Sequence, residues 1–388
     1  MLTLRRGEIG PVVEILQLAL KRAGYDAKIN GGFDEKLEDT VKAFQQANGV
    51  EADGIVGQNT WERLMPYLSG YKTDESGKIT QLDFNLVPTD IRYVWQLVSF
   101  IIDGMAVRYP FLETGSIGKS IMGKDLYYIK IGTGAKEVMY NGTHHGNEWI
   151  TTPLLLKFAE EYAKAYSEDG EIYGRSASEL FRSKTLYIIP CVNPDGMDVV
   201  NGGLPVGEFY NNVLAISKNY PQIPFPDGWK ANVAGVDLNL NYPANWKKAK
   251  EIKYELGFIS PAPRDFVGDE PLSEPESAAM YNFTIAHPFA LTLSYHTQGK
   301  VIYWKYLDYL PKNSYVIGKA LAEASGYELS LTPPESSYAG YKDWFIQAFN
   351  KPGYTVEAGI GENPLPLEQF DEIYEDNKEL LMTALEMA

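Results

Sequence analysis

The stretch Asn141-Gly-Thr-His-His-Gly-Asn-Glu148 decides how the rest of the chain is interpreted. It follows the apolar run 138–140 and precedes the amphipathic segment Thr151–Tyr166, so the pattern predicts a strand, a tight polar turn and a helix. His145 and Glu148 stand three residues apart in the turn, a spacing that lets an imidazole and a carboxylate converge on one cation. Zinc accepts such nitrogen and oxygen ligands, and a catalytic zinc site uses three protein ligands and a water.

A third ligand has to come from elsewhere in the chain. The chain has four histidines, His144, His145, His287 and His296. His296 ends an apolar, β-rich run, so we expect it at the mouth of a sheet. A His-x-x-Glu pattern alone is common and usually marks a surface turn with an ordinary histidine. With His296 the ligand set is complete, and we expect one zinc ion held by His145, Glu148 and His296.

Length, charge and cysteine usage limit the class of protein. A chain of 388 residues is long enough for two domains with a sizeable core. The net charge of −16 argues against a nucleic-acid partner, which would need a basic surface. Cys191 is the only cysteine, so no disulfide forms within the chain, and we expect a buried, structural thiol. No apolar run is long enough for a membrane span, and the polar start Met1–Arg6 has no secretory signal, so we expect a soluble protein.

Residues 1–68 carry helix signals of their own. A first helix opens at Gly10-Pro11, a second covers about residues 34–48, and a third begins near Asn59. These signals alone fit any small helical adaptor. Residues 69–85, which are polar and contain glycine, are interpreted as a linker.

The pattern of residues 1–68 resembles the peptidoglycan-binding domain of bacterial cell-wall hydrolases. The matching residues are Leu4-Arg-Arg-Gly7, Gly10-Pro-x-Val13, Leu16-Gln17, Gly24-Tyr25, Gly32-Phe33, Val41-x-x-Phe44-Gln45 and Asp53-Gly54-x-x-Gly57-x-x-Thr60-Trp61. The resemblance implies attachment to the cell wall and no chemistry. We therefore expect a peptidoglycan-binding domain over residues 1–68.

Residues 86–388 alternate between helix and strand patterns. Helices are expected at 90–109, 274–286 and 367–387, a hairpin at 117–131, and strands at 185–189, 291–295 and 353–356. This alternation predicts an α/β domain with a mixed or largely parallel sheet flanked by helices. Polar residues gather where the strands end, and such sheets bind ligands there.

Several polar motifs follow one another in this region. They are His145-Gly-Asn-Glu148, Asn193-Pro-Asp-Gly196, Gly235-Val-Asp-Leu-Asn239, Ser294-Tyr-His296 and Thr355-Val-Glu357. Their order resembles the zinc carboxypeptidase family, the carboxypeptidase A-like metallopeptidases, over essentially all of residues 86–388. The resemblance implies the fold and zinc-peptidase activity of that family, with the small three-helix domain in front.

The resemblance also implies roles for individual residues. Asp237 matches the carboxylate that orients a ligand histidine. Glu357 matches the general base, which takes a proton from the zinc-activated water and passes it to the leaving amine. Lys230 aligns with an oxyanion-stabilising arginine, although a lysine lacks the planar guanidinium fork. Tyr338 is the candidate for the family's mobile tyrosine, and Tyr341 is the alternative.

The substrate-binding motif departs from the family pattern. Family exopeptidases have Asp-x-Asn-Arg-Asn, whose Asn and Arg hold the substrate's terminal α-carboxylate. Here Asn239 is kept, but Leu240 replaces the arginine and cannot bind a carboxylate. Lys342 falls on the position that sets side-chain preference at the pocket base. A cation there suits an acidic group on the leaving residue, although an ordinary surface lysine fits equally well.

A wall-binding domain, a lost carboxylate clamp and a pocket cation favour the peptidoglycan stem peptide as substrate. The chain resembles the bacterial γ-D-glutamyl-meso-diaminopimelate peptidases, which implies cleavage of that bond at the wall or on its fragments. Alternatives are a D,L- or L,D-carboxypeptidase on another stem-peptide bond, a general metallocarboxypeptidase, a zinc deacylase of small amides and an inactive wall-binding scaffold. Without a visible signal, the expected location is the cytoplasm, including the mother cell or spore, or outside by another export route. The sequence predicts no oligomeric state.

Overall fold

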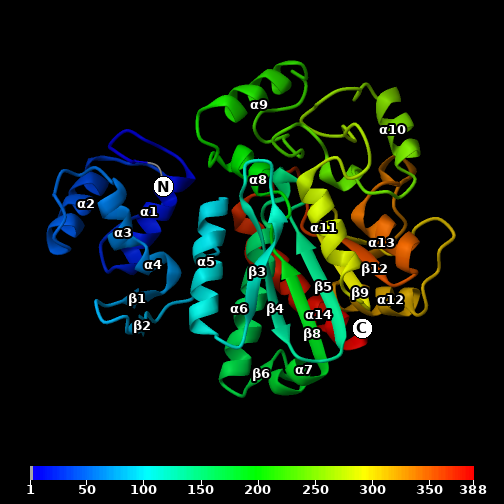
Figure 1. Cartoon of the computed structure of the whole chain (residues 1–388), viewed down its shortest axis with the longest axis horizontal. Coiled ribbons are helices and arrows are strands. Elements are labelled where there is room, and N and C mark those ends of the chain that lie inside the picture. The colour runs from blue at the N-terminus through cyan, green and yellow to red at the C-terminus, as the bar shows by residue number, and fades with distance from the viewer. Residues whose placement is uncertain (1–2) are drawn as a thin grey trace.

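The computed structural model describes residues 3–388, which form a small N-terminal helical unit beside a larger α/β unit (Figure 1). The small unit contains α1 (Pro11–Arg22), α2 (Glu35–Ala47), α3 (Gln58–Leu64) and the short α4 (Pro66–Ser69). Apolar faces of these helices bury Leu16, Val41, Phe44 and Leu64 in a common core. The three expected helices are present, and the third, α3, is followed directly by α4, which begins at Pro66.

The stretch expected to be a linker is partly folded. Strands β1 (Tyr71–Thr73) and β2 (Ile79–Gln81) pair antiparallel in a hairpin. The carboxylate of Asp74 accepts hydrogen bonds from the backbone nitrogens of Ser76 and Lys78, which closes the turn between the two strands.

Eight strands of the described residues form one mixed sheet, in the order β11-β10-β12-β9-β5-β8-β4-β3. Their bounds are β3 (Glu113–Lys119), β4 (Asp125–Gly132), β5 (Lys136–Gly142), β8 (Lys184–Ile189), β9 (Leu291–His296), β10 (Val301–Tyr303), β11 (Glu328–Ser330) and β12 (Gly353–Glu357). The four central strands β8, β5, β9 and β12 run parallel to one another, whereas β4 and β10 pair antiparallel with β8 and β12. Because parallel strands end at one edge, the polar residues after β5, β9 and β12 meet there.

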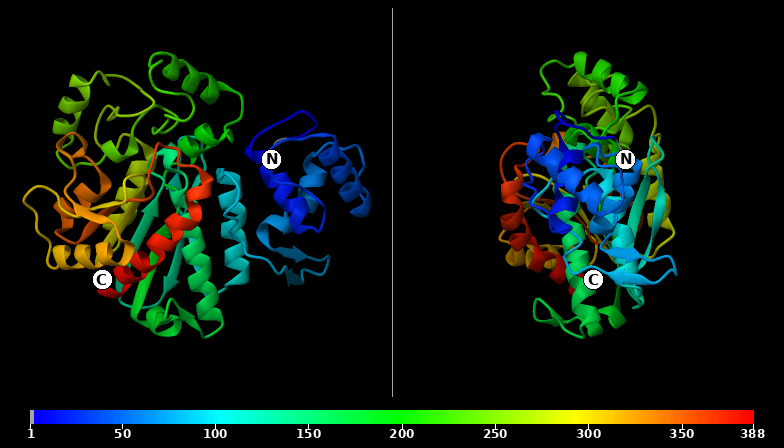
Figure 2. Two further views of the ribbon diagram at one scale, coloured as in Figure 1. Left: turned by 180° about the vertical axis from the view of Figure 1, so that it is seen from behind. Right: turned by 90° about the vertical axis from the view of Figure 1, so that its left-hand side faces the viewer.

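Helices cover both faces of this sheet (Figure 2). The helices of the larger unit are α5 (Trp95–Arg108), α6 (Thr151–Ser167), α7 (Ala177–Ser183), α8 (Pro194–Asn201), α9 (Glu208–Lys218), α10 (Trp246–Glu255), α11 (Pro275–Ile285), α12 (Ser314–Ser325), α13 (Tyr341–Phe349) and α14 (Phe370–Met387). Along β5, Val138 and Tyr140 join the core under α5, α6 and α14, whereas Met139 joins the core under α11 and α13. This alternation follows from the two-residue period of a strand. The predicted mixed sheet flanked by helices is confirmed.

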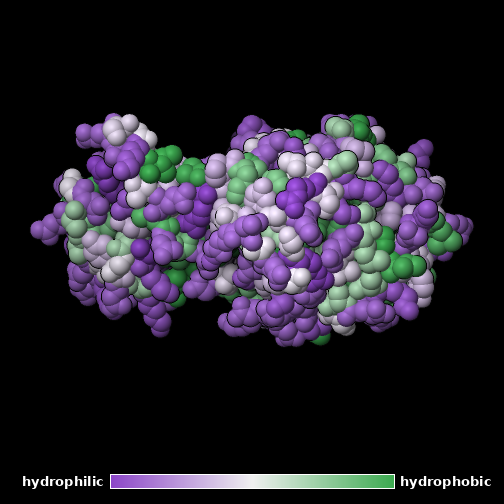
Figure 3. All heavy atoms as spheres, turned by 90° about the horizontal axis from the view of Figure 1, so that it is seen from below, coloured by the Kyte–Doolittle hydropathy of each residue, from purple (hydrophilic) through white to green (hydrophobic). Residues whose placement is uncertain are grey.

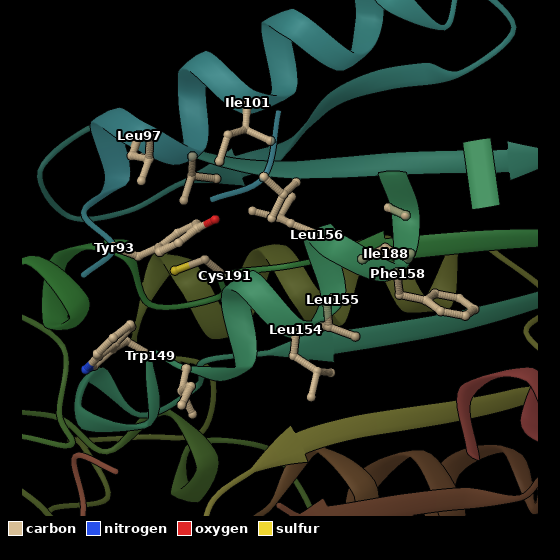
Figure 4. Close-up of a cluster of buried hydrophobic side chains, with 14 of the residues drawn as sticks. Tyr93, Leu97, Ile101, Trp149, Leu154, Leu155, Leu156, Phe158, Ile188 and Cys191 are labelled. Carbon is tan, nitrogen blue, oxygen red and sulfur yellow. The ribbon is translucent and has the colours of Figure 1, made fainter. Parts of the chain in front are cut away.

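The core on the α5 and α6 side contains the single cysteine (Figure 4). Cys191 lies among Tyr93, Leu156 and Ile188, as expected for a structural thiol, and burial raises its pKa to about 12. The face of the molecule seen in Figure 3 is mostly hydrophilic, with dispersed hydrophobic areas. Across residues 3–388, every helix falls short of the length and apolar character that a membrane crossing requires.

The two units are joined by a partly buried, polar junction. Arg92 of the large unit donates from Nη2 and Nε to Oε1 of Glu14 on α1, at 2.7 and 3.0 Å, and its backbone nitrogen donates to Oε2. Arg22 donates to the carbonyl oxygen of Asn85 at 2.7 Å. A side chain at Gly104 of α5 would meet the carbonyl oxygen of Ser69 at 2.2 Å, so glycine permits α4 and α5 to approach closely.

Candidate active site

The turn after β5 is held in place by the Asn193-Pro-Asp-Gly196 motif at the start of α8. Nδ2 of Asn193 donates to the carbonyl oxygen of His144 at 3.1 Å, and its Oδ1 accepts from the nitrogen of Gly196. A side chain at Gly146 would meet the carbonyl carbon of Gly196 at 2.5 Å. The turn therefore packs backbone against backbone, which fixes the directions of His145 and Glu148.

His145, Glu148 and His296 converge on one point. Oε1 of Glu148 lies 2.9 Å from Nδ1 of His145, and Oε2 lies 2.9 Å from Nδ1 of His296. The two Nδ1 atoms are 3.3 Å apart. All three residues are buried, and one ligand atom from each falls within 4.8 Å of the others. The sequence-predicted ligand set is thus brought together from the turn after β5 and the end of β9.

The electrostatics of this cluster favour a cation. Nε2 of His145, the nitrogen directed away from the cluster, contacts Oδ1 of Asp237 at 3.1 Å. Burial opposes charge on His145, but the carboxylates of Glu148 and Asp237 outweigh it and raise the pKa of His145 to about 9. Two imidazole nitrogens, one carboxylate and a further carboxylate behind a histidine match the donor set of a catalytic zinc site.

Glu357 ends β12, where it pairs in register with His296 of β9. Burial, followed by repulsion from the carboxylate of Glu148, raises the pKa of Glu357 to about 8. A carboxyl group with this pKa accepts a proton more readily near neutral pH than an ordinary glutamate does. Glu357 lines the same cavity as the His–Glu–His cluster.

Lys230, in the segment that follows α9, also lines this cavity. Its Nζ lies 3.0 Å from Oε1 of Glu148, and its carbonyl oxygen accepts from the nitrogen of Gly146. Burial opposes its charge, but Glu148 outweighs burial and raises the pKa of Lys230. The ammonium group is therefore held charged beside the reacting position.

The pocket base is formed by the start of α13. Lys342 is buried there, and its Nζ contacts the carbonyl oxygen of Lys305 at 3.0 Å, Oγ1 of Thr332 at 3.0 Å and Oδ1 of Asp343 at 2.8 Å. Lys342 thus lies in the cavity, as expected, but its ammonium group already donates two hydrogen bonds to protein atoms and forms an ion pair with Asp343. Leu240 lines the same cavity.

Asn239 connects the pocket to the metal cluster. Its Oδ1 accepts from the backbone nitrogen of Tyr341 at 3.0 Å, and its Nδ2 lies 3.4 Å from Nε2 of His296. Tyr341 is fully buried, with its hydroxyl 2.9 Å from Oγ1 of Thr284. Tyr338, in the preceding loop, is only partly buried, so of the two candidates it has the freer side chain.

The remaining histidines lie outside the cluster. His144 is buried behind it, and its Nε2 lies 3.0 Å from the hydroxyl of Tyr242. Burial lowers the pKa of His144, so it is a neutral packing residue. His287 pairs with Glu137 at 2.9 Å at the start of β5, far along the strand from the site.

Two hollows meet at the reacting position. The first, of about 170 Å³, contains the His–Glu–His cluster and Lys342. The second, of about 810 Å³, is lined by amides such as Asn147 and Asn363. Four residues, Lys230, Arg264, Tyr303 and Glu357, line both hollows. The site is therefore a cleft that continues on both sides of Glu357.

The sequence did not indicate several residues of this cleft. They are Lys253, Arg264, Asp265, Tyr303, Thr332 and Asn363. Arg264 and Asp265 lie in an irregular segment, 257–273, that has no strand or helix period. The polar pair Arg264-Asp265 between prolines and Phe266 was the only available signal.

Comparison with known proteins identifies the family. The family model described as "Zinc carboxypeptidase" matches residues 99–380. The chain belongs to the zinc carboxypeptidase family. A second model, "Putative peptidoglycan binding domain", matches residues 9–64. The family uses zinc, and the His145, Glu148 and His296 cluster of this zinc carboxypeptidase is positioned to bind it, so the protein is a zinc metallopeptidase.

One relative of this zinc carboxypeptidase is the Gamma-D-glutamyl-L-diamino acid endopeptidase 1 of Lysinibacillus sphaericus. It is 40% identical over 307 residues, which cover 79% of this chain and 75% of that protein. Among solved structures, thrombin activatable fibrinolysis inhibitor matches with a TM-score of 0.60 at 19% identity, covering 99% of this chain and 97% of that one. Carboxypeptidase A from Helicoverpa armigera matches with a TM-score of 0.56 at 20% identity, covering 92% and 88%. These two structures support the fold alone.

Proposed function

We propose that this zinc carboxypeptidase hydrolyses the γ-D-glutamyl-meso-diaminopimelate bond of peptidoglycan stem peptides. The observation that carries the proposal is the cleft, which extends on both sides of Glu357 and has Leu240 at the family's carboxylate-clamping position. Such a cleft suits a bond with substrate on either side. The 40% identity with the Lysinibacillus sphaericus endopeptidase supports the same linkage.

The reacting groups are proposed as follows. His145, Glu148 and His296 hold the zinc ion, which when bound supplies Lewis-acid polarisation and activation of water. Glu357 accepts the proton of the attacking water and donates it to the leaving amine of diaminopimelate. Lys230 places its ammonium group where negative charge develops on the carbonyl oxygen.

Other residues are proposed to orient these groups and the substrate. Asp237 fixes the ring of His145 through Nε2, so that Nδ1 faces the metal position. Asn239 and Tyr338 contact the substrate on the pocket side. Lys342 forms the pocket base, where binding a substrate carboxylate would require it to share its contacts with Asp343.

The division of the chain is part of the proposal. Residues 1–68 bind peptidoglycan, residues 69–85 connect the units and residues 86–388 carry out hydrolysis. The match of residues 9–64 to a peptidoglycan-binding model supports the first assignment. The test compares binding of the full chain and of a chain lacking residues 1–68 to insoluble sacculi, with circular dichroism confirming that both are folded. Equal binding would contradict the assignment.

The activity is tested on defined stem peptides. Zinc-loaded enzyme is incubated with L-Ala-γ-D-Glu-meso-diaminopimelate and with its D-alanine-extended tetrapeptide, and the products are read by mass. We expect L-Ala-D-Glu from both substrates, with diaminopimelate or diaminopimelyl-D-Ala as the second product. Release of D-alanine alone from the tetrapeptide would identify a carboxypeptidase instead. If both peptides remain intact, the proposal that the enzyme hydrolyses the γ-D-glutamyl bond is wrong.

A further inference from the structure

Arg264 is a cation of the cleft that the proposed chemistry does not use. It lines both the metal cavity and the second hollow, as do Lys230 and Glu357. Its side chain is 41% exposed, compared with 4% for Lys342 at the pocket base. Arg264 therefore faces the part of the cleft where the two hollows meet.

The backbone around Arg264 is fixed to the segment that carries Lys230. The nitrogens of Lys230 and Ala231 both donate to the carbonyl oxygen of Pro263, at 2.8 and 2.9 Å. On the other side, the nitrogen of Asp265 donates to Oδ2 of Asp237 at 3.2 Å. These contacts position Arg264 relative to the residues of the metal cluster.

The side chain of Arg264 is held at one edge only. Its Nε donates to Oδ2 of Asp265 at 2.8 Å, and the other oxygen of Asp265 lies 2.5 Å from Nζ of Lys253. Within residues 3–388, no hydrogen bond is found for Nη1 or Nη2 of Arg264. Asp265 thus orients the guanidinium group and leaves its outer fork open to the cleft.

An open guanidinium fork matches the two oxygens of a carboxylate. Lys342, by contrast, already has three protein partners, and Leu240 has no polar group. The substrate of the proposed function carries carboxylates on both sides of the scissile bond. A γ-D-glutamyl linkage leaves the α-carboxylate of D-glutamate free on the acyl side, and the diamino acid has its own on the leaving side.

We propose that Arg264 binds a substrate carboxylate next to the scissile bond and so replaces the clamp that Leu240 has lost. This inference rests on the proposed function and names the residue that would determine its specificity. Because Arg264 lines both hollows, its partner is either the α-carboxylate of D-glutamate or the side-chain carboxylate of diaminopimelate. Both partners are carboxylates, so they are distinguished with substrates that each lack one of the two.

The experiment compares wild type with Arg264→Gln on three peptides. They are L-Ala-γ-D-Glu-meso-diaminopimelate, its D-isoglutamine analogue with an amidated α-carboxylate, and L-Ala-γ-D-Glu-L-Lys, which lacks the side-chain carboxylate. We expect Arg264→Gln to lower kcat/KM on the first peptide roughly tenfold to a hundredfold, as for loss of a charge-assisted hydrogen bond. Arg264→Lys should recover part of the loss, and Arg182→Gln, at an exposed position of α7, should behave as wild type.

The pattern across substrates identifies the partner. A penalty that disappears with the D-isoglutamine peptide assigns the acyl-side carboxylate, and one that disappears with the lysine peptide assigns the leaving side. An unchanged kcat/KM, or the same fold-loss on all three peptides, would overturn the proposal.

Binding provides a readout that does not depend on turnover. In a Glu357→Gln background, calorimetric affinity for the same peptides is measured with and without Arg264→Gln, and the same tenfold to hundredfold, carboxylate-dependent loss is expected. If wild type cleaves no peptide but this loss is present, the proposed function fails and the assignment of Arg264 stands. If affinity is independent of Arg264, the assignment fails.

Discussion

Two polar regions of this protein, the buried metal cluster and the partly exposed junction between its units, use charge in opposite ways. At the junction, charged groups are matched to one another, as Arg92 is to Glu14 through two side-chain hydrogen bonds. In the cluster, both oxygens of Glu148 and two imidazoles face one point, and the nearby cation Lys230 contacts only one of those oxygens. The junction is complete without a ligand, whereas the cluster has the donor set of a site that binds one.

The difference shows how buried polar groups can be interpreted. A buried charge with matched partners usually stabilises an arrangement of the chain, and removing one partner leaves the other unpaired. Like groups that converge against their mutual repulsion, as Glu148 and Glu357 do, require a functional explanation. Substitutions in the two regions should therefore affect different measurements.

The largest effect is expected from His296→Ala. Loss of a ligand should exceed the roughly 10- to 100-fold decrease in metal affinity that follows loss of a supporting residue. Zinc content per chain after dialysis measures it. His287→Ala is the control, because that histidine pairs with Glu137 outside the cluster and should leave zinc unchanged. One zinc per chain in His296→Ala would show that the ligand set is wrong.

Glu357→Gln should keep both zinc and fold but lower kcat by about 10²–10⁴-fold, because an amide cannot accept the proton of water. Stem-peptide turnover and zinc content are measured together. Glu328→Gln, at an exposed position of the edge strand β11, should keep full activity. Near-normal turnover in Glu357→Gln would require another base.

Lys342→Met tests the comparison of the two regions, because Lys342 lies in the cleft but, like the junction residues, forms an ion pair with another protein side chain. Its removal leaves the buried carboxylate of Asp343 without its cation, so unfolding free energy should fall by about 3–5 kcal/mol. Denaturant unfolding measures this, and changing Asp343 to Leu as well should recover part of the loss. A stable variant that cleaves before lysine normally but before diaminopimelate poorly would instead show that Lys342 binds substrate.

Glu14→Ala should have the smallest effect. It removes the acceptor of the backbone nitrogen of Arg92 and of its guanidinium group, which is 42% exposed, so a loss of about 1–3 kcal/mol in unfolding free energy is expected. Turnover of soluble peptides at low temperature should not change. Glu8→Ala breaks an exposed pair with Arg5 at 3.8 Å and should cost less than about 0.5 kcal/mol. Equal losses of unfolding free energy in the two variants would mean that the Glu14–Arg92 pair stabilises the protein no more than an exposed ion pair does.

The parts of the fold with a clear period were predictable from the sequence. The turn at His145, the strand ending at His296 and the helix 274–286 were expected close to their positions, because each follows an apolar pattern of period 2 or 3.6. The hairpin at 71–81 was not, because its short strands are mostly exposed and have no apolar alternation.

The candidate site was predictable only where a residue ends a regular element. Arg264 lies in an irregular segment, and its place in the cleft depends on backbone contacts with Lys230 and Asp237, more than 25 residues earlier in the chain. Lys342 was expected in the pocket, but its partners Lys305 and Thr332 come from separate loops, so its paired state could not be inferred. Long-range pairing of irregular segments leaves no local pattern in a sequence.

The matched junction has a consequence for the range over which the enzyme can work. When a flexible linker joins a binding module to a catalytic domain, the length of the linker sets the local concentration of the catalytic domain around the point where the binding module is attached. Here Glu14–Arg92 and the close contact of α4 with α5 fix the separation instead. If the small unit binds peptidoglycan as proposed, the cleft then samples only bonds at one offset from the point of attachment. Progress along the wall would proceed by release and rebinding of the whole molecule, so the dwell time of the small unit would limit the rate on intact sacculi.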